Sequence, residues 1–468
     1  MHKDDVVAIF DCNDFYIKEI TVIRDDLMPF IVSESPKKFN EDFQNWRQNR
    51  CIPDISQKFQ NTKNFTVGLN YIDISNSVQA SVTDCYWFKI KSLFNVKWEE
   101  INYYINKLSD RSGGVMLDDD KFEKFYDQTE VLKSYFENNP RMPKNIKYFA
   151  LDQTDNYCIV KADNIENKGY DIFNEIIGNI ICDAIDLPHA EYYVVPYKIH
   201  NRINSVEVPL IACELCVQND NLEVITMKDL IRSGKINESE VYGDMVARGY
   251  QTFLDKMITL DFLMMNSKRD FSNFGYIRDA NNLRIIGVMP IFDCGSSLGY
   301  DEKTKRNGDI IKDYSMPFKE KHTEQIKLVS SFEWLNINDL YECIDEIEAV
   351  LSYSALPNEK QKEILNIFVS RIHLLEQYIS NTGMETVITE GASNLRIIEN
   401  IKHRFNVEKI KECEGFDPTK EFKIDKIFFG YLSDEGKKEF ESFDAFNPNM
   451  RERFIKFKED TFQIKNAT

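Results

Sequence analysis

Two oxygen-bearing side chains on neighbouring loops are the residues of this sequence best suited to chemistry. Asn273 lies in a polar loop, 266–275, and Asp293 follows an apolar segment further along the chain. Between them, two apolar segments flank the turn-rich sequence DANN at 279–282, which predicts a hairpin. Amide and carboxylate oxygens are the ligands that Mg²⁺ prefers, and a hairpin holds two of them at one separation. The sequence therefore predicts that Asn273 and Asp293 together bind Mg²⁺.

The motifs around these two residues are more specific than the residues alone. The first reads N-x₆-N-F-G from Asn266 to Gly275, and the second reads P-x-F-D-x-G from Pro290 to Gly295. Together they resemble the HipA-like protein kinase family, in particular its long, Firmicutes-type form. The resemblance spans roughly 6–380 and includes tryptophans near the start of the chain, which we expect to be core anchors. It implies an α+β, bilobal protein-kinase-like fold that binds ATP and Mg²⁺ between a β-rich N-terminal lobe and a helical C-terminal lobe.

A lysine and a glutamate further upstream fit the same resemblance. Lys161 ends a predicted hairpin, and Glu175 lies on a helix predicted from about residue 170 by a clean apolar stripe. In kinase folds this strand lysine contacts the α- and β-phosphates and pairs with the helix carboxylate. Taken alone, two such charges are most often simply exposed. The resemblance also makes Glu214, which follows a predicted strand, the candidate for the hinge that meets adenine.

The sequence departs from the family at two positions that carry chemistry. The family's catalytic loop reads N-x-D-R-H-x-x-N-F-G, whereas Lys268 stands here in the place of the aspartate and Asp270 in the place of the histidine. A protonated lysine cannot accept the proton of a substrate hydroxyl. Asp270 lies two residues further on, and it can replace the missing base if its side chain points inward.

The second departure is the phosphate loop. The segment 138–150 contains no glycine, although glycine lets backbone N–H groups approach a phosphate. Two prolines in this segment each remove a backbone donor. Lys144, with a neighbouring arginine, is the candidate to supply side-chain charge instead.

Three functions follow from this pattern. The first is a HipA-like, pseudokinase-like protein that binds Mg-ATP, transfers phosphate weakly or not at all, and acts through a protein partner. The second is an active Ser/Thr kinase that uses Asp270 as its base. The third is a structural or nucleic-acid-associated protein without nucleotide binding, a hypothesis that rests on the altered phosphate loop and on aromatic residues interleaved with lysines after residue 400.

Composition sets the outer limits. The chain has 468 residues and a net charge of −19, so it predicts more than one domain and makes general binding to nucleic acid unlikely. Its ten cysteines show no metal-like spacing, its first residues do not resemble a secretory signal, and no long apolar run predicts a membrane span. We expect a cytoplasmic protein. The predicted divisions are an N-terminal lobe at 1–115, an ATP-binding lobe at 116–218, a helical lobe at 219–385 and an appendage at 386–468.

Overall fold

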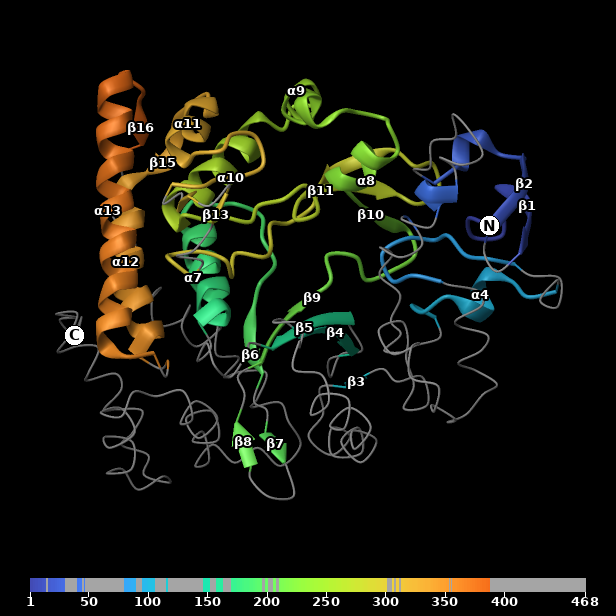
Figure 1. Cartoon of the computed structure of the whole chain (residues 1–468), viewed down its shortest axis with the longest axis horizontal. Helices are drawn as coiled ribbons and strands as arrows, with labels where there is room; N and C mark the ends of the chain where they lie inside the picture. The colour runs from blue at the N-terminus through green and yellow to red at the C-terminus, as the bar shows by residue number, and fades with distance from the viewer. Residues whose placement is uncertain are drawn as a thin grey trace, which may run out of the picture.

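A computed structural model of the chain shows a mixed fold of helices and small β-sheets (Figure 1). It describes residues 1–13, 16–29, 40–43, 46, 80–89, 95–105, 115–116, 146–151, 157–162, 170–195, 198–200, 205–207, 210–300, 305–306, 309–310, 313–352, 354 and 356–387. The predicted bilobal arrangement and the four domain boundaries remain predictions. Nearly all of the predicted appendage, 386–468, lies outside the described residues.

A five-stranded sheet carries Lys161. Its order is β3-β4-β5-β9-β6, and every neighbouring pair is antiparallel except β3 and β4. The predicted hairpin is confirmed as β4 and β5, and in the register of β5 with β9 Lys161 lies opposite Ile211. The strands are β3 (Val115–Met116), β4 (Ile146–Leu151), β5 (Tyr157–Ala162), β6 (Tyr193–Val195) and β9 (Leu210–Glu214). A separate hairpin pairs β7 (Lys198–His200) with β8 (Ser205–Glu207).

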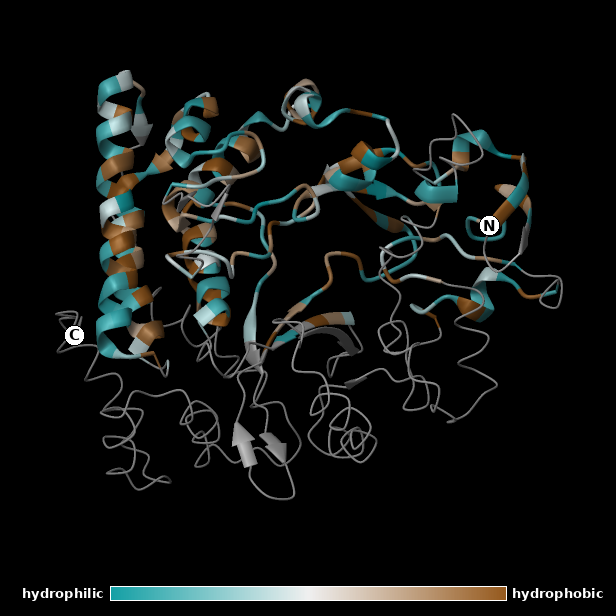
Figure 2. Ribbon diagram, viewed as in Figure 1, coloured by the Kyte–Doolittle hydropathy of each residue, from teal (hydrophilic) through white to brown (hydrophobic). Residues whose placement is uncertain are grey.

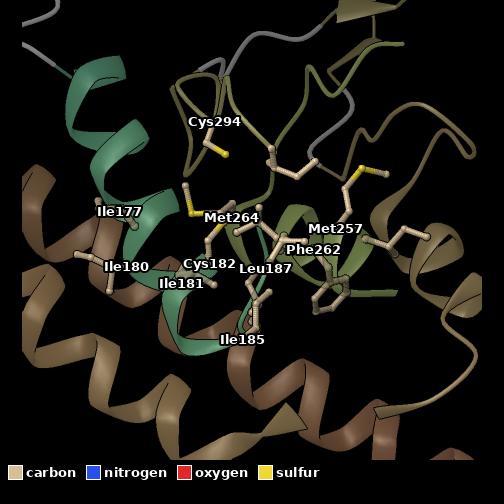
Figure 3. Packing of buried hydrophobic residues seen from close by; sticks show 14 of the residues in the cluster. Ile177, Ile180, Ile181, Cys182, Ile185, Leu187, Met257, Phe262, Met264 and Cys294 are labelled. Carbon is tan, nitrogen blue, oxygen red and sulfur yellow. The ribbon is translucent and has the colours of Figure 1, made fainter. Parts of the chain in front are cut away.

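The main hydrophobic core forms where four helices meet. The helix predicted from about residue 170 is confirmed as α7 (Tyr170–Ala184), and it meets α10 (Gln251–Met264), α12 (Ile337–Ser352) and α13 (Asn358–Thr382). Helices α12 and α13 run side by side at one end of the molecule, with α7 and α10 packed against them (Figures 1 and 2). Figure 3 shows Ile177, Ile180 and Ile181 of α7 in the same hydrophobic cluster as Met257, Phe262 and Met264 of α10.

The second sheet holds the two loops that carry the predicted metal ligands. It is antiparallel, with the order β10 (Leu222–Thr226), β11 (Gly275–Asp279) and β12 (Ile285–Val288). The hairpin predicted around 279–282 is therefore confirmed. Asn273 lies just before β11, and Asp293 lies a few residues after β12. The chain thus leaves and returns to the site at the same end of the hairpin.

The N-terminal residues pack on this second sheet. Strands β1 (Ala8–Asn13) and β2 (Tyr16–Val22) form a hairpin near its far end (Figure 1). Trp87 and Trp98 are buried in one core cluster, which confirms the prediction that they anchor a core. Tyr86, which is also buried, donates a hydrogen bond from its hydroxyl to the Leu27 carbonyl.

Short elements complete the described part of the chain. They are η1 (Asp25–Leu27), α4 (Trp98–Ile101), α8 (Met227–Arg232), η4 (Glu238–Glu240), α9 (Val241–Ala247), β13 (Lys305–Arg306), β14 (Asp309–Ile310), α11 (His322–Gln325), η5 (Ile326–Leu328), β15 (Phe332–Asn336) and β16 (Thr386–Val387). None of the helices that the structure describes is long and apolar enough to cross a membrane.

Candidate functional site

Lys161 is the centre of a buried charge cluster. Its Nζ pairs with Glu175 Oε1 and lies 2.9 Å from Asp293 Oδ1, so strand β5, helix α7 and the turn after β12 meet at one ammonium group. The ring of Tyr192 lies against the same group, with its centroid 4.8 Å from Nζ. Burial alone lowers the pKa of Lys161, but the charges of Asp293 and Glu175 raise it well above its usual value. The lysine is therefore charged. We call Lys161, Glu175 and Asp293 the cleft cluster, after the site between two lobes that the resemblance to the HipA-like family implies for them.

Glu175 connects the lysine to the turn that carries Asp293. It lies on the part of α7 that faces the core and is buried, with a side chain that is 4% exposed. One carboxylate oxygen pairs with Lys161, and the other accepts a hydrogen bond of 2.7 Å from the backbone N–H of Cys294. Because both oxygens are used, the burial of this carboxylate is compensated.

Asp293 is the most exposed member of the cleft cluster. Its side chain is 30% exposed, against 9% for Lys161. The three residues together carry one positive and two negative charges, so the cluster itself has a net negative charge. A hard divalent cation such as Mg²⁺ matches both that charge and the oxygen ligand. The donor set therefore fits Mg²⁺.

The loop before β11 is held against the Asp293 turn by a buried ion pair. Helix α10 ends at Met264, its C-cap residue Met265 adopts a left-handed conformation, and Asn266 then turns back to donate to Asp261. Arg269, whose side chain is fully buried, donates to both oxygens of Asp261 and to the carbonyl of Phe292. The residue just before Asp293 is thus tied to the loop that carries Asn273.

Asn273 is positioned by the backbone of its own loop. Its side-chain N–H₂ donates to the carbonyl of Lys268 at 3.0 Å, and the oxygen of the same amide group is Oδ1. That oxygen accepts a longer contact of 3.3 Å from the Ser272 hydroxyl. Asn273 is buried, and its part in binding Mg²⁺ stays a prediction.

The two altered positions of the catalytic loop have different surroundings. The Lys268 side chain is exposed. The Asp270 carboxylate accepts hydrogen bonds from the N–H and hydroxyl of Ser272 and lies 3.6 Å from the Lys228 ammonium. Asp270 therefore closes a local turn. Both bonds from Ser272 end on Oδ1, and the Lys228 ammonium lies beside Oδ2.

The remaining predicted residues lie apart from the cleft cluster or outside the described residues. Glu214 is exposed at the end of β9, where the chain leaves the five-stranded sheet for β10, a position compatible with the predicted hinge. Lys144 lies outside the residues that the structure describes. Among the predicted residues, the structure directly joins Lys161 to Glu175 and Asp293, and Asn273 to Lys268.

Two supporting residues were not predicted from the sequence. Asp261 anchors Arg269, and Asn174 donates from its amide to the carbonyls of Gly295 and Ser297 at 2.9 and 2.8 Å. Polar residues within apolar helical runs are the signal that could have identified them, since a buried polar group requires a partner. The sequence does not reveal which loop supplies that partner.

A second group in the described residues resembles a metal site in its residue types. Ligand atoms of His2, Cys85 and Glu223 lie within 4.8 Å of one another, and all three residues are buried. Glu223 already accepts from His2 at 2.9 Å and from Arg278 at 2.6 Å, and the Cys85 thiol donates to the Asp220 carbonyl at 3.3 Å. Burial raises the pKa of that thiol, which disfavours the thiolate that a metal requires. This group is therefore satisfied without a metal.

Comparison with known proteins gives a distant structural similarity but no match to a protein family. No protein-family model matches this chain, and no curated protein matches it. Similar solved structures include a crystal structure of the Helicobacter pylori proinflammatory kinase CtkA, with 14% sequence identity and a TM-score of 0.34. That similarity covers 51% of this chain and 95% of the other.

Proposed function

We propose that this chain is a HipA-like, kinase-fold protein that binds Mg-ATP, transfers phosphate weakly or not at all, and acts through a protein partner. The observation that carries the proposal is the cleft cluster, in which Lys161 pairs with Glu175 and contacts Asp293. A strand lysine, a helix glutamate and a loop aspartate that meet in this way are typical of nucleotide sites in kinases. The resemblance of the loop motifs to the HipA-like family supports the same reading.

Each residue has a role in this proposal. Lys161, held by Glu175, binds the α- and β-phosphates, while Asp293 and Asn273 hold Mg²⁺. The metal neutralises charge on the phosphates when it is bound. With nucleotide bound, the Lys161 ammonium would keep its bond to Glu175 and donate to the phosphates. Asp293 would supply a carboxylate oxygen to the metal.

Weak or absent transfer follows from the catalytic loop. Lys268 replaces the family's proton acceptor, and the Asp270 carboxylate is already bonded to Ser272. Loss of a general base commonly lowers a rate by about 10²–10⁴-fold. We therefore expect nucleotide binding with little turnover.

Thermal stabilisation by nucleotide and transfer of labelled phosphate test this proposal together. Mg-ATP at about 100 times its Kd should stabilise the wild-type protein by about 2.7 kcal/mol, an effect that Lys161→Met and Asp293→Ala should abolish. Lys235→Ala, at an exposed lysine away from the cleft cluster, is the control that should keep the effect. No shift with millimolar Mg-ATP would overturn the proposal. Labelling that disappears in Asp270→Ala would instead show an active kinase that uses Asp270 as its base.

A further inference from the structure

Backbone strain is concentrated on the two loops of the candidate site. Asp293 has φ +66°, in the left-handed region that costs a side chain roughly 1–2 kcal/mol. The described non-glycine residues with positive φ are Lys3, Asp186, Met265, Leu283, Asp293 and Leu298. Three of these six belong to the loop after α10 or to the Asp293 turn. Such conformations persist only where the surroundings enforce them, and they concentrate at functional sites.

Side chains from one helix and one loop enforce the conformation of the Asp293 turn. Before Asp293, the Phe292 carbonyl accepts from Arg269. Directly after it, the Cys294 N–H donates to Glu175. Beyond that, Asn174 on α7 donates to the carbonyls of Gly295 and Ser297, which lie two residues apart. The backbone on both sides of Asp293 is therefore fixed, while the carboxylate itself faces Lys161.

Of the three residues that hold the turn, Asn174 is the one whose role is easiest to test by substitution. It is fully buried but uncharged, so its replacement leaves no unpaired charge, unlike replacement of Arg269 or Glu175. Gly295 lies so close to α7 that a β-carbon there would be 3.2 Å from Asp171. The turn is thus pressed against the helix at the position where Asn174 binds it.

We propose that Asn174 is a positioning residue that holds the strained Asp293 turn in its metal-binding geometry before nucleotide arrives. This inference rests on the proposed function for the identity of the ligand, Mg²⁺ with a nucleoside phosphate.

The first test measures binding of ADP with and without Mg²⁺ by calorimetry. Asn174→Ala should weaken Mg²⁺-dependent ADP binding by about ten-fold, as loss of an outer contact to a metal ligand commonly does. ADP binding without metal should stay unchanged. Asn179→Ala is the matched control, because Asn179 is a buried asparagine of the same helix. In an Asp293→Asn background, Asn174→Ala should have no further effect on the metal. Equal weakening with and without Mg²⁺, or additivity in the double variant, would overturn the proposal.

The second test needs no ligand and so remains decisive if the protein binds no nucleotide. At an ordinary φ, glycine is less stable than alanine, but at an enforced positive φ the order reverses. Asp293→Gly should therefore melt at a higher temperature than Asp293→Ala, and Asn174→Leu, which lacks the donor but keeps the bulk, should reduce that difference. An unchanged difference would refute the positioning role, whereas absent nucleotide binding with the expected difference would refute only the proposed function.

Discussion

Two buried charge clusters in this molecule contain similar residues but differ in charge balance and in exposure. The cleft cluster has two carboxylates for one lysine, and its Asp293 side chain is 30% exposed. The second, which we call the N-terminal cluster, consists of His2, Glu223 and Arg278. Its Glu223 side chain is fully buried, that of Arg278 is 4% exposed, and their opposite charges balance.

The surroundings of the two carboxylates explain the contrast. Glu223 accepts from His2, from Arg278 and from the backbone N–H of Cys85, so its oxygens are used inside the protein. This cluster joins the start of the chain to β10 and β11, far from the loops at the other end of the hairpin. Asp293, by contrast, stands in a turn with a left-handed φ, and its side chain is 30% exposed. A balanced, sealed cluster stabilises a fold, whereas an unbalanced and accessible one is suited to a ligand.

Removing one carboxylate from each cluster should separate these roles. Glu223→Ala leaves Arg278 buried without its partner, which should lower the free energy of unfolding by about 3–5 kcal/mol. Asp293→Ala should cost roughly 1 kcal/mol or less, because the side chain is partly exposed and Glu175 still pairs with Lys161. Urea denaturation at pH 7 measures both. Equal losses of unfolding free energy in the two variants would contradict this distinction, because the cleft cluster would then stabilise the fold as much as the N-terminal cluster does.

Acid should weaken the N-terminal cluster within a defined pH range. Burial alone raises the pKa of Glu223, but the hydrogen bond from His2 and the charge of Arg278 lower it from 4.5 to about 2. The unfolded chain therefore takes up the proton first as the pH falls. The stabilisation is complete above pH 4.5 and is lost between pH 4.5 and about 2, by on the order of 3 kcal/mol.

Urea denaturation of the wild type and of Glu223→Gln at a series of pH values measures this loss. The variant cannot titrate at this position, so its stability should fall less steeply below pH 4.5. Parallel pH profiles would show that Glu223 does not contribute in this way.

The sequence predicted the local elements of the site better than the polar contacts that hold the Asp293 turn. The apolar stripe of α7 and the turn residues at 279–282 are local signals, and both elements are present. The proximity of Lys161, Glu175 and Asp293 followed only from the resemblance to a family, since they lie far apart in the chain. The structure brings them together as that resemblance implies, while their roles remain proposals.

The contacts that hold the Asp293 turn could not be predicted, because they join polar side chains to backbone groups far away in the sequence. Asn174 binds carbonyls more than a hundred positions away, and a carbonyl has no signature in the sequence. The left-handed φ of Asp293 was equally hidden, because aspartate adopts this conformation without glycine to mark it. The N-terminal cluster was missed for a similar reason, since His2 and Glu223 are also distant along the chain.

Packing between α7 and the Asp293 turn gives the smallest expected effect and involves no charge. A β-carbon on Gly178 would lie 2.8 Å from the β-carbon of Cys294, which follows Asp293 directly (Figure 3). Overpacking of this kind costs about 1–3 kcal/mol, whereas alanine gains at most about 1 kcal/mol over glycine in a helix. The clash should prevail, because the Cys294 backbone is held by its bond to Glu175.

Gly178→Ala should therefore lower the melting temperature and weaken Mg²⁺-dependent ADP binding together, since relief of the clash moves the turn. Cys294→Gly in the same chain removes the opposing β-carbon and should restore part of both. Gly243→Ala on α9 is the matched control, because a β-carbon there meets nothing within 4 Å, and it should stabilise the protein slightly. A loss of stability with unchanged metal binding would show that the turn does not depend on its packing against α7. Its hydrogen bonds with Asn174, Glu175 and Arg269 would then be sufficient to hold it.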